Sequence, residues 1–260
     1  MSTAAQSERV EILGIKLAVQ QFDDAVESLI GHAQRRGSFR AHFCNVHAVV
    51  EAQSNIRLRT AFESADLLCM DGMPLVWLAR RRGFAAAERV CGPDMMLALS
   101  DRGRSSGLRH YYLGGAADTP AALAAALTTR YPGLLVAGFS SPPFGQLTTE
   151  QNDAIVDQVN AAKPDILWIG LGLPKQEIWA ADQQARLDVP LVLPVGAAFD
   201  FHAGRTPRAP RWMQRLGLEW LQRLSREPRR LGWRYLRTNV LFVFLVAKGL
   251  VRSRGRESGD

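Results

Sequence analysis

Six short apolar runs, separated by stretches with helical periodicity, constrain the fold of this chain more than any other feature. Each run is a strand candidate, and together they span residues 40–46, 66–70, 108–115, 134–141, 165–172 and 189–201. The segments between them, such as residues 47–65 and 147–164, carry apolar residues at the spacing of a helix. Apolar strands that alternate with helices predict an α/β fold, in which helices cover both faces of a mostly parallel sheet.

The charge of the chain changes sharply near residue 204. Residues 204–260 carry 14 of the 32 Lys and Arg residues but only 4 of the 25 Asp and Glu residues, a net charge of +10 against −3 for the rest. Thirteen of these cations are arginines, whose planar guanidinium groups suit phosphate oxygens. We therefore expect two parts: a main domain at residues 1–203 and a basic, amphipathic helical appendage at residues 204–260.

The appendage combines its cations with aromatic and apolar side chains. Pro228 is expected to begin a new helix, and one helical face would hold Leu216, Trp220, Leu224 and Leu231. The run VLFVFLVA that follows is too short to span a bilayer, which needs about 20 apolar residues. This composition is typical of an element that lies on an anionic membrane surface. Nucleic acid is the rival partner for a basic patch, but an apolar run does not help to bind a phosphodiester backbone, so we expect no nucleic acid.

A further use of the apolar stretch at residues 240–251 stays open, because it could pack on the main domain or on a second copy of the chain. The amino terminus is polar and mixed in charge, unlike a signal peptide. Three cysteines without a CxxC pair predict reduced thiols. These features predict a cytoplasmic protein that is peripheral to a membrane.

Glycines and short polar residues follow each predicted strand. In chain order they are Asn45 and His47, Asp71 and Gly72, Gly114 and Gly115, Ser140 and Ser141, Gly172 to Glu177, and Gly196 with Asp200. In a parallel sheet these residues share the carboxyl edge, where ligands bind, and glycine allows a phosphate or a sugar to approach closely. Such residues also favour ordinary turns, but six turns on one edge favour a binding site.

Asp71 is the strongest single candidate for a catalytic residue. It stands between an apolar strand and a helix with proline in its first turn, so its carboxylate should face the cleft and could act as a general base. The alternative is a helix cap. Arg89 is expected to pair with that carboxylate or with a phosphate, unless it is an ordinary surface arginine.

The sequence contains little that indicates a metal site or a cofactor site. The five histidines lack ligand spacing and no Asp-x-Asp occurs, so we expect no metal. The stretches GLGLPK and GGAADT both depart from GxGxxG, which disfavours a dinucleotide cofactor and an NAD-dependent oxidoreductase.

Several spaced motifs together carry a resemblance to a known family. They are ADLLCMDGMPLVW, ERVCGPDMM, YYLGG, PDILWIGLGLPKQEIW, VGAAFDFHAG and RAPRWMQRLGLEWLQRLSREPRR. From about residue 10 to 237 the chain resembles the WecG/TagA/CpsF glycosyltransferases, glycosyltransferase family 26. The resemblance implies a Rossmann-like catalytic domain and an inverting, metal-independent enzyme of cell-surface polysaccharide synthesis. Such an enzyme moves a sugar from a UDP-sugar to a polyprenyl-diphosphate-linked sugar, at the inner face of the plasma membrane.

The resemblance also implies roles for single residues. Asp71 matches the proposed catalytic base. The other matching positions are Asn45, Arg89 and Gln176 in the pocket, and Arg223 and Arg230 on an appendage thought to close over the nucleotide or the lipid diphosphate. Gln176 is therefore expected to bind the substrate. The other substrate-binding residues expected in these turns are Gly172, Gly196 and Asp200.

Two departures from the family pattern bear on the substrate. Phe43-Cys44-Asn45 replaces a Thr-x-Asn, and this form is similar to the exopolysaccharide branch, including xanthan-type glucosyltransferases. UDP-glucose is therefore a candidate donor beside N-acetylmannosamine or its uronic acid. Trp233, with Arg234 beside it, replaces a third appendage arginine. The alternative from another class is a non-catalytic protein that binds a nucleotide or RNA through the basic tail.

Overall fold

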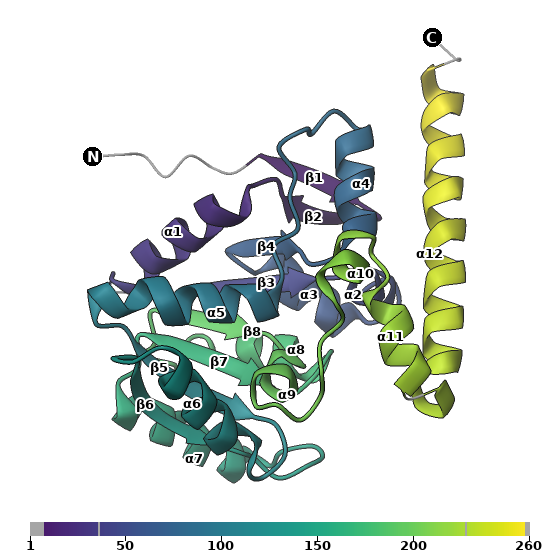
Figure 1. The fold of residues 1–260 in the computed structure, drawn as a ribbon. Helices are drawn as coiled ribbons and strands as arrows, with labels where there is room; N and C mark the ends of the chain where they lie inside the picture. Colours follow the sequence, from purple (N-terminus) through teal and green to yellow (C-terminus); the bar gives the residue numbers. More distant parts are fainter. Residues whose placement is uncertain (1–7, 36, 227, 258–260) are drawn as a thin grey trace, which may run out of the picture.

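A six-stranded parallel sheet forms the centre of the protein (Figure 1). The computed structural model describes residues 8–35, 37–226 and 228–257. Across the sheet the strands run in the order β4-β3-β8-β7-β5-β6. They are β3 (Phe39–Cys44), β4 (Leu67–Met70), β5 (Arg109–Gly114), β6 (Leu135–Ser140), β7 (Ile166–Gly170) and β8 (Leu191–Pro194). The predicted parallel sheet is confirmed, and so are the positions of its six strands.

Helices cover both faces of this sheet because successive strand side chains point to opposite sides. Ile166 and Trp168 of β7 pack with α1 (Phe22–Ala33), α5 (Gly92–Arg102), α6 (Thr119–Arg130) and α9 (Ala198–His202). Leu167 and Ile169 of the same strand pack with α7 (Thr149–Ala162) and α8 (Lys175–Gln183). Beside them, α2 (Val46–Glu51), α3 (Ile56–Glu63) and α4 (Met73–Arg81) enclose a third apolar cluster. The two-sided cover predicted from the apolar strands is confirmed.

An amino-terminal hairpin adds two strands that the sequence analysis did not assign. β1 (Arg9–Ile12) and β2 (Ile15–Ala18) pair antiparallel, and β2 lies against β4. Leu13 and Gly14 connect them with φ values of 52° and 77°. A two-residue hairpin turn with positive φ at both positions usually carries Asn-Gly, so Leu-Gly gave no signal.

The single helix predicted for residues 47–65 is wrong, because the structure has two. The chain leaves α2 after Glu51 and begins α3 at Ile56. Asn55 stands at the N-cap of α3, and its side-chain oxygen accepts from the amide of Leu58 at 3.1 Å. An Asn side chain that binds the backbone in this way competes with the interior of a helix and favours a new helix start.

The carboxyl-terminal appendage is helical, as predicted, and Pro228 begins its last helix. It consists of α10 (Arg211–Arg215), α11 (Glu219–Arg226) and α12 (Pro228–Glu257). The predicted shared face is wrong for Leu216, which ends α10, because Gly217 turns the chain at φ 65° before α11. A Cβ on Gly217 would lie 3.2 Å from the Cβ of Met73. This turn therefore packs on the first turn of α4.

Helix α12 stands along one side of the main domain and contacts α2 and α11 (Figure 1). Phe242 is only 7% exposed and joins the apolar cluster beneath α2. The hydroxyl of Thr238 lies 3.5 Å from Nδ1 of His47 in α2. Packing on the main domain, one of the uses left open for this stretch, is thus observed for one face of the helix.

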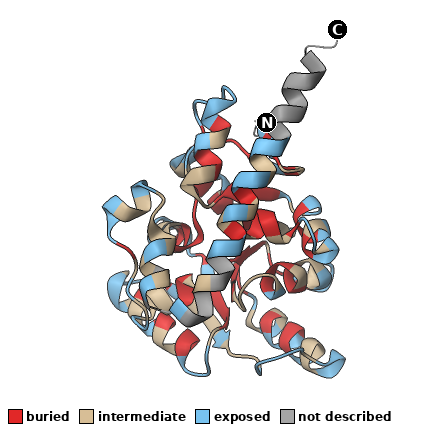
Figure 2. Cartoon of the chain, turned by 90° about the vertical axis from the view of Figure 1, so that its right-hand side faces the viewer, coloured by how far each residue is buried: buried red, intermediate tan, exposed pale blue. Residues whose placement is uncertain are grey.

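A row of four apolar side chains is exposed on α12, whose exposed residues are pale blue in Figure 2. Its members are 59–66% exposed and follow one another at helical spacing: Leu236, Val240, Val243 and Phe244. We call them the outer stripe. Among the residues that the structure describes, no helix combines the length and the hydrophobicity that crossing a bilayer requires.

Gly170, at the end of β7, offers a test of this packing. A Cβ there would lie 2.7 Å from the ring of the buried Phe199 in α9, so we expect Gly170→Ala to lower the free energy of unfolding by about 1–3 kcal/mol. Gly31 in α1 is the matched control. Nothing lies within 4 Å of its added Cβ, so Gly31→Ala should stabilise the protein by up to about 1 kcal/mol. Urea unfolding of the two variants measures both effects, and equal midpoints would contradict the expectation.

Candidate active site

Four adjacent strands bring most of the predicted site residues to one edge of the sheet. Asp71 follows β4, Asn45 follows β3, Gly196 follows β8 and Gly172 follows β7. These strands are neighbours in the order β4-β3-β8-β7 and are all parallel. The expectation that the polar turns share the carboxyl edge is therefore confirmed for these four.

Asp71 and Asn45 lie side by side. The amide of Asp71 donates to the carbonyl of Cys44 at 2.8 Å. The exposed Asn45 caps α2, because its side-chain oxygen accepts from the amide of Ala48 at 3.0 Å. Its amide nitrogen is the end that a ligand could meet. The N-cap of α4 is Gly72 and not Asp71, so the carboxylate is not at the cap position that was the alternative role.

Arg89 pairs with Asp71, as one of its predicted roles required. Its Nη2 lies 3.4 Å from Oδ1 of Asp71, and the two side chains are 15% and 18% exposed. The adjacent Val90 donates its amide to the carbonyl of Met70, which holds this segment beside the end of β4. Arg89 is thus a partly buried partner of the carboxylate and not an ordinary surface arginine.

A line of alternating charges extends from this pair into the appendage. Oε2 of Glu219, in the first turn of α11, lies 2.7 Å from Nη2 of Arg89. Oε1 of the same carboxylate lies 3.5 Å from Nε of Arg208. Arg208 in turn binds both carboxylate oxygens of Asp94. The appendage is therefore connected to the main domain through ionic contacts that begin at Asp71.

Sequence reasoning missed three members of this line: Arg208, Glu219 and Asp94. Each stands inside a motif that carries the family resemblance, but their spacing along the chain gives no sign that they meet. Arg89 and Glu219 are 130 positions apart. Only the fold brings them together.

Both arginines are held firmly in the charged state. Burial alone would lower the pKa of Arg89, but Asp71 and Glu219 raise that pKa above its ordinary value. The pKa of Arg208 is raised in the same way against its burial, chiefly by its hydrogen bonds to Asp94. Partly buried ion pairs of this kind are less screened by salt than exposed pairs.

The side chain of Gln176 contacts both glycine turns, at Gly172 and at Gly196. Its Oε1 accepts from the amide of Gly172 at 3.1 Å, and its Nε2 donates to Oε1 of Glu177 at 2.8 Å. A Cβ on Gly196 would lie 3.3 Å from that Oε1, so the carboxamide lies directly against this glycine. Gln176 is 5% exposed, and its carboxamide is engaged inside the protein. Contact with a substrate, the role implied by the resemblance, remains a prediction.

Glu177, which the sequence analysis placed in the polar turn after Gly172 without a role of its own, is a buried acid. It is 3% exposed, and among the described residues its Oε2 has no hydrogen-bond partner. Burial raises the pKa of Glu177 to about 7, against the opposing effects of the hydrogen bonds from Gln176 and its own backbone.

The remaining predicted residues lie on the helices that follow. Asp200 is in α9, and its backbone carbonyl accepts from the amides of Arg205 and Thr206 at 2.9 and 3.1 Å. Arg223 and Arg230 fall in α11 and α12, but their side chains lie outside the described part of the structure. Their role over the substrates therefore stays a prediction.

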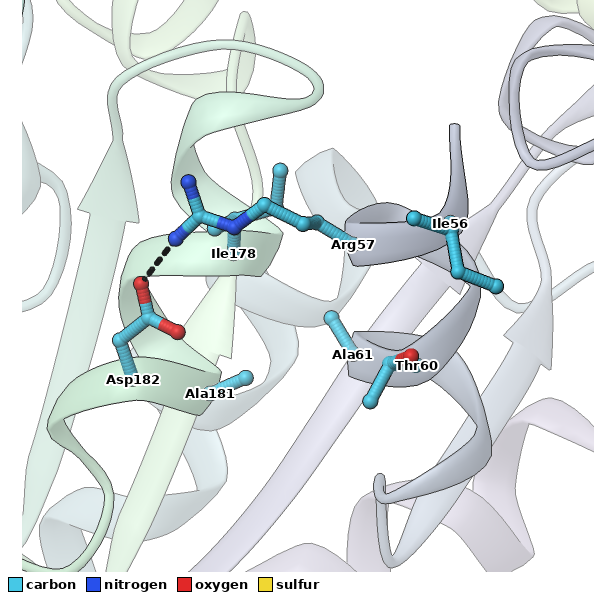
Figure 3. A pocket seen from close by; sticks show the side chains of 7 residues that line it. All are labelled: Ile56, Arg57, Thr60, Ala61, Ile178, Ala181 and Asp182. Atoms are coloured by element: carbon cyan, nitrogen blue, oxygen red, sulfur yellow. Dashed lines mark hydrogen bonds and ion pairs between the residues drawn. The ribbon is translucent and has the colours of Figure 1, made fainter. Parts of the chain in front are cut away.

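A separate pocket lies between α3 and α8 (Figure 3). Arg57 reaches across it to Asp182, with 2.7 Å between Nη2 and Oδ2. The rest of the lining is Ile56, Thr60, Ala61, Ile178 and Ala181. The pocket contains none of the predicted site residues. Across the described ranges, no group of three or more His, Cys, Asp or Glu side chains could hold a metal ion.

Comparison with known proteins identifies the family of the chain. The family described as Glycosyl transferase WecG/TagA/CpsF matches residues 10–256. The chain belongs to the WecG/TagA/CpsF glycosyltransferase family. It is similar to the N-acetylglucosaminyldiphosphoundecaprenol N-acetyl-beta-D-mannosaminyltransferase of Bacillus spizizenii strain W23. The two are 27% identical over 232 residues, which cover 87% of this chain and 87% of the relative.

Membership of the WecG/TagA/CpsF family identifies the protein as a glycosyltransferase. It also decides between the two classes left open by the sequence, an enzyme and a non-catalytic binding protein, in favour of the enzyme. The motif with Asp71 and the motif with Gln176 both lie within the matched residues.

Glu177 makes the stability of this glycosyltransferase depend on pH. Its pKa is about 7 in the folded protein against an ordinary value of 4.5, so between these values the folded state binds a proton that the unfolded chain does not. The contribution of Glu177 to stability is therefore present below pH 4.5 and is lost as the pH rises to 7. Glu177→Gln keeps an oxygen for Gln176 but cannot ionise, and should remove this loss, which is on the order of 3 kcal/mol at most.

Urea unfolding of both proteins from pH 4.5 to 8 measures the difference. The difference in free energy of unfolding between wild type and Glu177→Gln should change across this pH range and level off above it. Glu63→Gln, at a carboxylate whose side chain is 58% exposed, is the control and should shift the curve little. Parallel curves for wild type and Glu177→Gln would contradict the prediction.

Proposed function

We propose that this glycosyltransferase moves a hexose or an N-acetylhexosamine from a UDP-sugar to a polyprenyl-diphosphate-linked sugar, with inversion and without a metal, in cell-surface polysaccharide synthesis. The observation that carries the proposal is the Asp71 carboxylate at the carboxyl edge of the sheet, paired with Arg89 and beside the exposed Asn45. The relative supports the substrate class, because its name gives a diphosphoundecaprenol-linked sugar as acceptor and a mannosaminyl group as the unit transferred.

In the proposed mechanism, Asp71 accepts the proton of the acceptor hydroxyl. The acceptor oxygen attacks the anomeric carbon from the face opposite the UDP group, and the bond from that carbon to the UDP oxygen breaks. One proton moves to the carboxylate while the electron pair of the broken bond leaves with UDP. Arginines and the backbone amides of the glycine turns stabilise the departing diphosphate.

Phe43 bears on the choice of donor. Phe43, at the position where many family members carry threonine, is 8% exposed and packs in the core beside Val195 and Gly92. It therefore offers no hydroxyl to a sugar. This supports the exopolysaccharide branch and UDP-glucose as a donor, whereas the relative transfers an N-acetylmannosaminyl group.

The outer stripe of α12 supports attachment to a membrane surface. Its four apolar side chains are exposed on a segment in which arginines dominate the charge. Apolar insertion and attraction to anionic lipid act together in interfacial helices. We place the enzyme at the inner face of the plasma membrane, where its lipid-linked acceptor would be presented.

Asp71→Asn tests the assignment of the base. The asparagine keeps the shape of the side chain and can still meet Arg89, but it cannot accept the proton. We expect UDP binding within about twofold of wild type and turnover lower by a factor of about 100 or more. Calorimetric titration with UDP measures the binding, and a transfer assay with a lipid-linked acceptor measures the turnover. Asp182→Asn is a control with the same change of charge, and full turnover by Asp71→Asn would end the assignment.

A pair of substitutions in the outer stripe tests the membrane contact. Val243→Asp with Phe244→Asp places two carboxylates on this exposed face, so sedimentation with anionic liposomes should fall strongly while the fold is kept. The control is Ile56→Asp, at an apolar side chain that is 72% exposed on α3. Undiminished sedimentation of the double variant would exclude the outer stripe as the contact.

A further inference from the structure

Glu219 occupies a position between two arginines that belong to other elements. Its two oxygens lie 2.7 Å from Nη2 of Arg89 and 3.5 Å from Nε of Arg208, and all three side chains are 15–17% exposed. Arg89 precedes α5 and Arg208 precedes α10. Two guanidinium groups that converge on one small anion from different elements form a typical oxyanion site.

We propose that Arg89 and Arg208 form a diphosphate subsite and that the Glu219 carboxylate fills it until a substrate enters. This inference rests on the proposed function, because both substrates of that reaction carry a diphosphate. Asp71 lies 3.4 Å from the same Nη2 that binds Glu219, so an anion in place of Glu219 sits next to the reacting groups.

Glu219 is the member of the charged line that can leave at the lowest cost. Asp71 and Asp94 belong to the end of β4 and to α5, inside the main domain, and each stays with its own arginine. Glu219 belongs to α11, which follows the turn at Gly217, so Glu219 can leave with α11 while Arg208 stays bound to Asp94. A diphosphate also carries more negative charge than the carboxylate it replaces.

The competing explanation is that Glu219 holds α11 permanently in place. The two explanations differ in the change of diphosphate affinity that they predict when the charge of Glu219 is removed. If Glu219 competes with the diphosphate, removing its charge strengthens diphosphate binding. If Glu219 only builds the site by holding the appendage in place, removing its charge weakens binding or leaves it unchanged.

The experiment titrates the full chain with UDP and with inorganic pyrophosphate by calorimetry. Glu219→Gln, which keeps the size of the side chain, should bind both ligands at least about fivefold more tightly than wild type. Glu63→Gln makes the same change of charge on the exposed pair with Arg59 and should bind like wild type. Unchanged or weaker binding of pyrophosphate by Glu219→Gln would overturn the subsite. If this variant does not fold, Glu219→Ala gives the same test.

Further titrations show which substrate supplies the diphosphate. They also distinguish a failure of the subsite from a failure of the proposed function. A gain with UDP but not with geranyl diphosphate assigns the subsite to the nucleotide, and the reverse assigns it to the lipid-linked acceptor. If UDP binds wild type and neither UDP nor geranyl diphosphate binds Glu219→Gln more tightly, the inference fails while the proposed function stands. If UDP does not bind wild type, the proposed function fails, and the pyrophosphate titration alone decides the inference.

Discussion

One guanidinium group, that of Arg89, connects the carboxyl edge of the sheet to the appendage. The same Nη2 meets Asp71 at 3.4 Å and Glu219 at 2.7 Å. Because the two carboxylates share this cation, the position of α11 and the position of the proposed base are not independent. This contact is one of the places where the basic segment reaches the carboxyl edge of the main domain.

The second half of the edge is built differently, from amide groups and glycines. Gln176 joins the turn at Gly172 to the turn at Gly196, and Glu177 fixes the far end of its carboxamide. A bulky side chain in place of either glycine would conflict with its positive φ. Ion pairs therefore organise the β4-β3 side of the edge, whereas the hydrogen bonds of Gln176 organise the β8-β7 side.

The sequence predicted what depends on local pattern. The six strands, the shared edge and the start of α12 at Pro228 all follow from apolar runs and from proline. The hairpin turn at Leu13 was missed because its residues are unusual for positive φ, and the break before Asn55 was hidden within a continuous helical pattern. The contact of Glu219 with Arg208 arises from chain folding alone, so no spacing in the sequence could reveal it. Asp71 was predictable because strand, carboxylate and helix start are adjacent in the chain.

Helix α12 is apolar on two opposite sides, with Phe242 buried against the main domain and the outer stripe exposed. The first contact fixes the second in space, because the helix cannot turn about its axis without uncovering Phe242. A bilayer that accepts the outer stripe would therefore set the tilt of the whole enzyme above the lipid surface. The carboxyl edge of the sheet would then face a fixed direction relative to the membrane, so that an acceptor diffusing in the plane of the lipid would always approach it from the same side.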